Sequence, residues 1–349
     1  MVEPTKVTKP VIERLSVASE LIEDQELDLR TPSIRPTKFV DYPGQEDVKK
    51  NLEVYVAASL KRARPMDHVI LHGAPGLGKT TLANIIANEL GVPFVATSGP
   101  AIDKSGDLAG ILTGLEPGSL LFIDEIHRLN IKVEEVLYSA MEDFSIDIII
   151  GQGAAARSVR MDIAPFTLVG ATTRLSLLSR PLLGRFGIQE RLEFYDAPAL
   201  TKILFRTSDI LGFKLSDEAA LEIAHRSRGT PRLANRLLRR VADFADVENL
   251  REINRKVADL ALVRQGIDAS GLDRVDRRIL MTMLEQYEGG PVGIETLAVT
   301  LNEDRDTIED VYEPYLVYRG FIARTPRGRS LTSQGLNYVK TQLNKHCLD

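Results

Sequence analysis

Apolar and polar blocks alternate between residues 69 and 173. The apolar run VILH at 69–72 precedes a glycine-rich loop and then TLANIIANEL, where apolar residues recur at helical spacing. Three further apolar runs, VPFVAT, SLLFIDEI and FTLVGATT, are separated by segments with a helical pattern, such as VEEVLYSAMEDF. Short apolar strands that alternate with helices are typical of parallel βαβ units with a covered sheet. Residues 34–195 are therefore predicted to form one α/β domain.

A different pattern interrupts this domain near residues 146–163, IDIIIGQGAAARSVRMDI. Two apolar or alternating arms flank a Gly-Gln-Gly turn region, which predicts a β-hairpin insertion. Ile148, Ile149 and Ile150 are consecutive, so they cannot all face one side of a strand. At least one is exposed unless something covers it, which suits a partner-binding arm; packing on its own domain is the alternative.

After residue 195 the pattern of apolar residues becomes mainly helical. Residues 196–266 are predicted to form a small helical domain, with core candidates at Leu221, Ile223, Ala224, Leu233, Leu237, Leu238 and Val241. Residues 269–349 begin with an amphipathic helix, followed by a short helix, IETLAVTLN, and a longer one from Asp306 to Tyr318. A strand-like FIART, a turn at Pro326–Gly328, another short strand and a last helix follow. Helices followed by a two-stranded ribbon predict a winged helix-turn-helix.

Residues 1–33 show little periodicity. Five acids lie within the nine residues from Glu20 to Asp28, which favours a mobile acidic tail. A short docked helix is the alternative, since Leu15, Ile22 and Leu27 could form an apolar stripe.

Composition narrows the class of protein. The 349 residues suggest two or three domains, and 44 Lys plus Arg against 49 Asp plus Glu leave a net charge of −5. The single cysteine, Cys347, excludes an internal disulfide framework and a cysteine-clustered metal site. No apolar run approaches the roughly 18–20 residues that span a bilayer, and MVEPTKVTKP lacks the hydrophobic stretch of a secretion signal. We therefore expect a cytoplasmic protein.

Charge is divided unevenly within the last domain. Residues 303–313 carry six acids against Arg305 alone, whereas residues 321–345 carry five bases and no acid. An acidic helix would be repelled by DNA phosphates, so it is a poor candidate for reading bases in the major groove. Arg324, Arg327 and Arg329 surround a tight turn and could hold phosphates without reading sequence. A solvated basic turn is the alternative.

The loop Gly73–Thr80, GAPGLGKT, satisfies the phosphate-loop pattern GxxxxGK[ST] between an apolar strand and a helix. Glycines such as Gly76 and Gly78 let successive backbone N–H groups turn inward around phosphate oxygens at a helix N-terminus. In this pattern Lys79 reaches the β- and γ-phosphates and the Thr80 hydroxyl ligates Mg²⁺. A glycine turn that binds nothing would not need the flanking strand and helix.

Two adjacent acids, Asp124 and Glu125, end the apolar run SLLFIDE about forty residues after this loop. At the end of a parallel strand, both can approach the phosphate loop from different angles. In a Mg²⁺-nucleotide site, the first acid completes the metal shell and the second polarises the attacking water. Taken alone, such a pair would more often be a solvated surface pair.

Further motifs make a family resemblance specific. FTLVGATTR at 166–174, LGRFG at 183–187 and GTPR at 229–232 resemble the sensor and arginine-finger series of AAA+ ATPases. Supporting runs occur in order from about residue 34 to 335: IRP at 34–36, DYPGQ at 41–45, MED at 141–143, RLEFY at 191–195 and RTPRGR at 324–329. In this detail the chain resembles the RuvB family of AAA+ motors, which drive branch migration of Holliday junctions.

The resemblance implies roles for individual residues. Thr173, or Thr172 beside it, would be sensor 1, a hydroxyl near the γ-phosphate and the attacking water. Arg232 would be sensor 2, approaching from the helical domain. Arg185 would be an arginine finger that enters the neighbouring subunit's site, a charge stabiliser worth roughly 10³–10⁵ in rate. The fold class implied is an AAA+ P-loop ATPase with a helical lid and a winged-helix domain, working as a homo-hexameric ring.

The remaining implied nucleotide-site positions are Ile34, Arg35, Thr81, Glu142, Asp143, Phe144 and Tyr195. The implied activity is ATP- and Mg²⁺-dependent translocation of duplex DNA at Holliday junctions, in recombination, DNA repair and the SOS response to DNA damage. The hairpin isoleucines would dock on RuvA, and RuvC would join the larger resolvase assembly.

The sequence departs from the family pattern at two places. Ala74 stands where a second proline is common, which leaves the backbone cradle intact, and Leu183 and Gly184 replace a charged pair. A clamp loader or initiator-like ATP switch is the main alternative, but such chains often carry a Ser-Arg-Cys finger and a zinc module. An unfoldase would need an aromatic-hydrophobic-glycine pore loop, and we find no convincing one.

Overall fold

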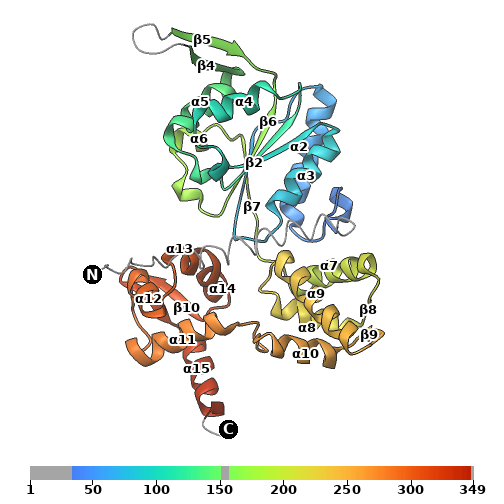
Figure 1. Cartoon of the computed structure of the whole chain (residues 1–349), viewed down its shortest axis with the longest axis vertical. Helices are drawn as coiled ribbons and strands as arrows, with labels where there is room; N and C mark the ends of the chain where they lie inside the picture. Colours follow the sequence, from blue (N-terminus) through green and yellow to red (C-terminus); the bar gives the residue numbers. More distant parts are fainter. Residues whose placement is uncertain (1–33, 151–156, 347–349) are drawn as a thin grey trace, which may run out of the picture.

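The computed structural model describes residues 34–150 and 157–346, which form an α/β domain, a helical domain and a winged-helix domain (Figure 1). The α/β domain occupies the upper half of Figure 1, and the other two domains lie beneath it. The acidic tail predicted at 1–33 lies outside the described residues.

A five-stranded parallel sheet in the order β2-β3-β6-β1-β7 forms the centre of the α/β domain. Its strands are β1 (Val69–His72), β2 (Phe94–Ser98), β3 (Leu120–Asp124), β6 (Thr167–Thr172) and β7 (Ile188–Arg191). Strand β6 lies between β3 and β1, and Thr172 is in register with His72. Because all strands are parallel, their carboxyl ends meet at one edge, where the loops after residues 72, 124 and 172 come together.

Helices cover both faces of this sheet. Val69 and Leu71 belong to a core with α2 and α3, whereas Ile70 between them belongs to a second core with α4 and α5. This alternation follows from the two-residue period of a strand, and it explains why the buried strands read as continuous apolar runs. The helices are α2 (Glu46–Arg62), α3 (Lys79–Leu90), α4 (Ser105–Thr113), α5 (Ile131–Asp143) and α6 (Arg180–Leu183). Short 3₁₀ turns are η1 (Phe39–Asp41), η2 (Gly99–Ala101), η3 (Ile126–Arg128) and η5 (Leu175–Leu177).

The predicted hairpin is present. Strand β4 (Ser145–Ile150) pairs antiparallel with β5 (Arg157–Asp162), and the pair projects beyond α5 at the top of Figure 1. Every described side chain of β5 is exposed, including Val159 and Met161, whereas Ile146 at the base of β4 is buried.

Four helices form the helical domain: α7 (Ala197–Leu211), α8 (Asp217–Arg226), α9 (Pro231–Val247) and α10 (Arg255–Arg264). The prediction of a wholly helical segment is wrong at one point, because β8 (Lys214–Leu215) pairs in parallel with β9 (Glu252–Ile253). Two residues are too few to produce a recognisable strand pattern. The prediction for Leu221 is also wrong: it is 44% exposed, because it lies nearly half a turn around α8 from the buried Ile223.

The winged-helix domain follows the predicted order of elements. It contains α11 (Arg274–Tyr287), α12 (Ile294–Leu301), α13 (Arg305–Thr307), a π-helical turn η6 (Ile308–Tyr312), α14 (Glu313–Tyr318), β10 (Ile322–Thr325), β11 (Gly328–Leu331) and α15 (Ser333–His346). Strands β10 and β11 are antiparallel and form the wing. None of the helices in the described ranges is long and apolar enough to cross a membrane.

Candidate functional site

The loop between β1 and α3 adopts the conformation that its glycines predict. Gly73 and Gly78 have φ values of +147° and +95°. A Cβ at Gly73 would lie 2.5 Å from the Leu192 carbonyl oxygen, and one at Gly78 would lie 2.9 Å from Tyr42 Oη. Helix α3 begins at Lys79, so the loop lies at a helix N-terminus that favours anions.

Lys79 lies at the carboxyl edge of the parallel sheet, among the charged groups predicted for the nucleotide site. Its Nζ donates to the carbonyl oxygens of Gly73 at 2.9 Å and Ala74 at 3.0 Å. Burial, with a smaller effect of Arg232, lowers the pKa of Lys79 to about 8, although Asp124 and Glu125 act to raise it. The predicted catalytic residues Lys79, Asp124, Glu125 and Arg232 are thus electrostatic neighbours, although they come from three separate segments.

Asp124 ends β3 and Glu125 turns away from it. Glu125 has φ +50°, a left-handed conformation that residues other than glycine rarely adopt, and its N–H donates to Asp124 Oδ1 at 2.9 Å. Burial raises the pKa of Glu125, and Asp124 and Asp310 raise it further, against Lys79 and Arg128. A carboxylate with a raised pKa accepts a proton from water more readily, as a general base must.

The end of β6 distinguishes the two threonines proposed for sensor 1. Thr172 is buried, its Oγ1 lies 2.9 Å from His127 Nδ1, and this oxygen accepts a hydrogen bond from the Arg174 N–H at 3.0 Å. Thr173 is half-buried beside it. Because the Thr172 hydroxyl is already engaged inside the protein, Thr173 stays our prediction for the residue that meets the γ-phosphate.

Arg232 is brought to the phosphate loop by α9. Its N–H donates to the Gly76 carbonyl oxygen at 3.3 Å, and a Cβ at Gly76 would lie 3.1 Å from Arg232 Cβ. The first turn of α9 therefore packs directly on the loop. This contact places a cation of the helical domain beside the nucleotide site, as the sensor 2 prediction requires.

A pocket beside α3 brings together three of the predicted nucleotide-binding residues, Arg35, Thr80 and Thr81. Its other lining residues are Pro36, Thr37, Asn84 and Phe94. Tyr195 is placed differently: it is buried, and its Oη donates to Tyr42 Oη at 2.8 Å and lies 3.4 Å from the Leu77 carbonyl oxygen. Tyr195 thus contacts the phosphate loop from the interior of the protein. Ile34 comes just before the pocket residues in the chain and is half-buried.

The donors predicted for the metal fit Mg²⁺. Thr80 follows Lys79 in the first turn of α3, and Asp124 is the last residue of β3, so both offer oxygen at the carboxyl edge of the sheet. Mg²⁺ bound with nucleotides takes one or two protein oxygens in addition to phosphates and water. A hydroxyl and a carboxylate are therefore a sufficient donor set, and neither needs a dedicated metal cage.

Arg185 lies on a different surface, formed by α5 and the residues that follow α6. Its Nη2 donates to Glu142 Oε2 at 2.9 Å, its Nη1 donates to the Pro181 carbonyl oxygen at 2.8 Å, and its guanidinium lies 4.7 Å from the centre of the Tyr138 ring. The structure brings the predicted finger together with Glu142. Asp143 instead accepts from Arg160 of the hairpin at 2.8 Å, and Phe144 packs edge-on against Phe166.

The three arginines of the wing differ in their surroundings. Arg324 and Arg329 are cross-strand neighbours, and both donate to the carboxylate of Glu313, which is only 2% exposed. The Arg324 side chain is 54% exposed but that of Arg329 only 17%. Arg327 at the tip is exposed. Arg324 and Arg327 are therefore available to DNA phosphates, whereas Arg329 is largely committed within the domain.

The partner-binding prediction falls on Ile148, Ile149 and Ile150. Their backbones pair with Val159, Ser158 and Arg157 in the hairpin. Their side chains lie outside the part of the chain that the structure describes, so the exposure of this arm stays a prediction.

Sequence reasoning missed His127, Glu313 and the side-chain role of Arg174. His127 contacts Thr172 and lies 3.5 Å from Glu125, whereas Arg174 binds acids of the winged-helix domain. The signal for His127 was available, since it follows Glu125 by two residues, but a lone histidine there has no pattern of its own. The partners of Arg174 and Glu313 are remote in the chain or lie in a different element, and no local spacing indicates them.

With Arg232 of the helical domain packed on the phosphate loop of a β2-β3-β6-β1-β7 sheet, the fold and site are those of an AAA+ ATPase, and this one carries a winged-helix domain. Residues 34–192 match the family described as the Holliday junction DNA helicase RuvB P-loop domain. Residues 195–268 match the RuvB AAA lid domain, and residues 269–340 match the RuvB C-terminal winged helix domain. The chain belongs to the RuvB family.

Individual relatives agree with this assignment. The chain is 57% identical over 310 residues to the Holliday junction branch migration complex subunit RuvB of Myxococcus xanthus, covering 89% of this chain and 90% of that protein. The solved Thermotoga maritima RuvB Holliday junction branch migration motor is 50% identical, with a TM-score of 0.81 over 88% of this chain and 98% of that one. A solved mutant of the same Thermotoga protein gives a TM-score of 0.82 at 50% identity. The predicted fold class and family are therefore confirmed.

Proposed function

We propose that this protein is the ATP-driven motor of Holliday-junction branch migration, a Mg²⁺-dependent ATPase that moves duplex DNA through a homo-hexameric ring. Membership of the RuvB family supports the motor over a clamp loader or initiator-like switch. The observation that carries the proposal is the convergence of Lys79, Asp124, Glu125 and Arg232 at one sheet edge, in a chain that also holds an exposed basic wing.

In this mechanism, each residue has a separate task. The loop N–H groups and Lys79 would bind the β- and γ-phosphates. Thr80 and Asp124 would hold Mg²⁺, which would supply positive charge against the phosphate oxygens. Glu125 takes a proton from the attacking water, and Thr173 orients that water. Arg232 would contact the γ-phosphate. The helical domain would respond to this contact, because its helix α9 packs on the phosphate loop.

Arg185 completes the site of a neighbouring protomer in this proposal. It lies with Glu142 on the α5 and α6 surface, where a second copy of the chain could place its own phosphate loop. A finger in trans makes hydrolysis depend on the ring, so that one protomer can pass its nucleotide state to the next. Shifts of the helical domain against the α/β domain would then move DNA that is held by the wing.

The partners follow from the same proposal. RuvA would recognise the junction and hold the motor there through the hairpin arm at Ile148–Ile150, and RuvC would join the larger resolvase assembly. The chain would act in the cytoplasm, where DNA is recombined and repaired, including during the SOS response to damage. The relative named as a branch migration complex subunit supports an assembly of this kind.

The test is the rate of ATP hydrolysis with and without duplex DNA, alongside ATP-dependent dissociation of a synthetic four-way junction with purified RuvA. We expect DNA to stimulate hydrolysis and RuvA to be required for junction movement. Glu125→Gln should retain ATP binding but lose about 100-fold or more in turnover, because it keeps the shape and removes the base. Hydrolysis without junction movement under ring-forming conditions would favour the ATP switch instead.

A further inference from the structure

A chain of polar contacts leads from Glu125 to the backbone of Arg174. His127 Nε2 lies 3.5 Å from Glu125 Oε2, and His127 Nδ1 lies 2.9 Å from Thr172 Oγ1. Thr172 Oγ1 accepts from the Arg174 N–H at 3.0 Å, and it can donate its own proton to His127 Nδ1 when the ring carries its proton on Nε2. In that tautomer the Nε2–H of His127 faces the carboxylate of Glu125, which can accept from it. Any displacement of Arg174 therefore acts on Thr172, and through it on His127.

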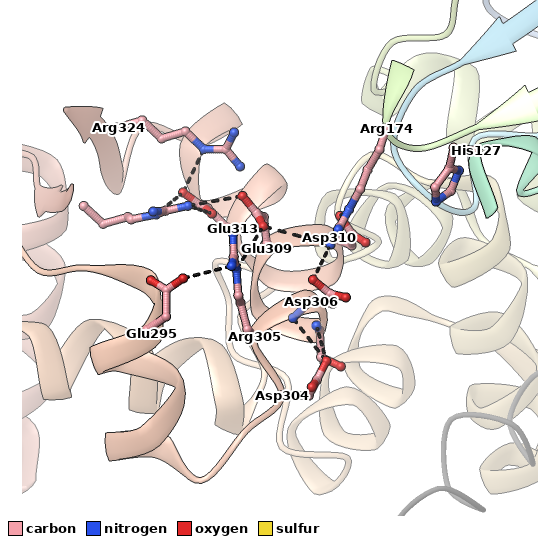
Figure 2. Close-up of polar contacts among 12 residues, drawn as sticks. His127, Arg174, Glu295, Asp304, Arg305, Asp306, Glu309, Asp310, Glu313 and Arg324 are labelled. Carbon is pink, nitrogen blue, oxygen red and sulfur yellow. Dashed lines mark hydrogen bonds and ion pairs between the residues drawn. The ribbon is translucent and has the colours of Figure 1, made fainter. Parts of the chain in front are cut away.

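The side chain of Arg174 extends from this point into the winged-helix domain (Figure 2). Arg174 Nε donates to Asp310 Oδ1 at 2.7 Å, Nη2 donates to Asp306 Oδ1 at 2.9 Å, and Glu309 Oε2 lies 4.0 Å from Nη2. The Arg174 side chain is 22% exposed, so water screens these pairs less than those of a surface arginine. Charge-assisted hydrogen bonds of this length are among the stronger polar contacts in proteins.

The same acidic segment, residues 304–313, holds the wing on its other side. Glu309 Oε1 lies 3.4 Å from Arg329 Nη2, and the buried Glu313 accepts from both Arg329 and Arg324. Glu309 is thus shared among Arg174, which follows β6, Arg329 in the wing, and Arg305 of its own segment. Figure 2 shows these carboxylates lying between Arg324 and Arg174.

We propose that Arg174 is a positioning residue through which the winged-helix domain, and DNA bound at its wing, sets the hydrolytic activity of Glu125. The inference rests on the proposed function, because it gives DNA-dependent hydrolysis a physical route. It assigns the acidic segment 304–313 the role of docking Arg174 rather than of entering a DNA groove.

The direction of the effect follows from exchange of partners. DNA phosphates attract the exposed Arg324 away from Glu313, which then binds Arg329 more fully. Arg329 releases Glu309, whose carboxylate becomes available to Arg174 at the opposite side. DNA binding therefore strengthens the contacts of Arg174 with the acidic segment. These contacts in turn hold Thr172 and His127 in position beside Glu125. Because binding linkage is reciprocal, loosening Arg174 should also weaken DNA binding.

The test compares ATP hydrolysis by three variants with and without duplex DNA. Arg174→Ala removes the link, the double variant Asp306→Asn with Asp310→Asn removes its partners, and Arg240→Ala is the control. Arg240 forms an exposed pair with Asp243 in α9 at 3.0 Å, away from the acidic segment. We expect the first two to lose at least five-fold of the DNA stimulation of kcat, with KM for ATP changed less than two-fold. The control should keep both rates.

A second test exchanges the charges of Arg174 and Asp310. It distinguishes a positioning role of Arg174 from a purely structural one. Arg174→Glu alone should lose the DNA stimulation, and adding Asp310→Arg should restore at least half of it, because the pair is remade with reversed charges. Retention of the stimulation by Arg174→Ala, or failure of the exchange to restore it in folded protein, would overturn the proposal. A wild-type protein whose hydrolysis ignores DNA would overturn the proposed function as well, so the two failures are distinguishable.

Discussion

Arg185 and Glu142 form an ion pair on the surface of α5 and the residues after α6, with 2.9 Å between Nη2 and Oε2. The arginine that we propose as the finger thus lies beside an acid that is itself exposed. Such a pair can exchange Glu142 for the phosphates of an adjoining protomer, because exposed ion pairs contribute little stability.

This placement predicts complementation between two inactive variants. Arg185→Ala should lower turnover by roughly 10³-fold or more, and Lys79→Ala should abolish phosphate binding in its own site. Mixed rings should recover activity, because a Lys79→Ala protomer supplies Arg185 to an intact phosphate loop. Hydrolysis measured across mixing ratios tests this, with Arg180→Ala, an exposed arginine of α6, as the matched control. No recovery in mixed rings would contradict a finger in trans.

Lys79 predicts proton uptake on nucleotide binding. Burial lowers its pKa to about 8, so the free site loses this positive charge as pH rises through 8. Phosphates favour the charged form and raise the pKa again, so ATP binding at pH 8.5 should take up most of one proton, and at pH 7 very little. Titration calorimetry in buffers of different ionisation enthalpy measures this uptake. Lys79→Arg should bind without it, and equal uptake by both proteins would show that another group titrates.

Two arginines of the wing should respond differently to truncation. Arg327→Ala should weaken DNA binding for all sequences alike and reduce the salt dependence of log K by about 0.9, the effect of one phosphate contact. Arg329→Ala should instead lower stability by roughly 3 kcal/mol, because it leaves the buried Glu313 with fewer partners. Binding measured over a salt series, together with the melting temperature, separates the two. An unchanged melting temperature for Arg329→Ala would mean that its role lies with DNA.

Asp276 predicts a pH-dependent stability. Its carboxylate is fully buried, and burial raises its pKa to about 7 despite the partner Arg228. The folded protein therefore binds this proton up to about pH 7, whereas the unfolded chain releases it near its ordinary pKa of about 4. The free energy of unfolding should fall as pH rises from about 4 to 7. Asp276→Asn should remove that part of the fall, which urea unfolding at several pH values would detect; an unchanged slope would contradict the assignment.

Much of the fold could be predicted because its signals are local. Strands β1, β2, β3 and β6 appear as apolar runs, the hairpin as two arms around glycines, and the wing as a short ribbon after helices. The two-residue pairing of β8 with β9 could not be predicted, because it has no periodicity. Leu221 shows the opposite error: an apolar residue on a helix was assigned to the core, although its position on α8 faces solvent.

The candidate site also has residues that the sequence predicts and residues that it does not. The residues Gly73–Thr80, Asp124 and Glu125 follow from sequence alone, because phosphate binding needs consecutive backbone groups and the catalytic acids are neighbours in the chain. Parallel strands then bring their ends together without further information. Chemistry that is encoded within a few residues of one strand end was therefore determined before any fold was known.

Only the tertiary structure decided which distant charges meet. Arg174 and Asp310 are 136 positions apart, Thr172 and His127 are 45 apart, and Arg185 and Glu142 are 43 apart. Each pair depends on how whole elements or domains pack, and packing is set by the sum of many apolar contacts rather than by either residue. The sequence around a charged side chain does not indicate its partner. The proposed link between the wing and Glu125 therefore depends on the packing of the winged-helix domain against the end of β6.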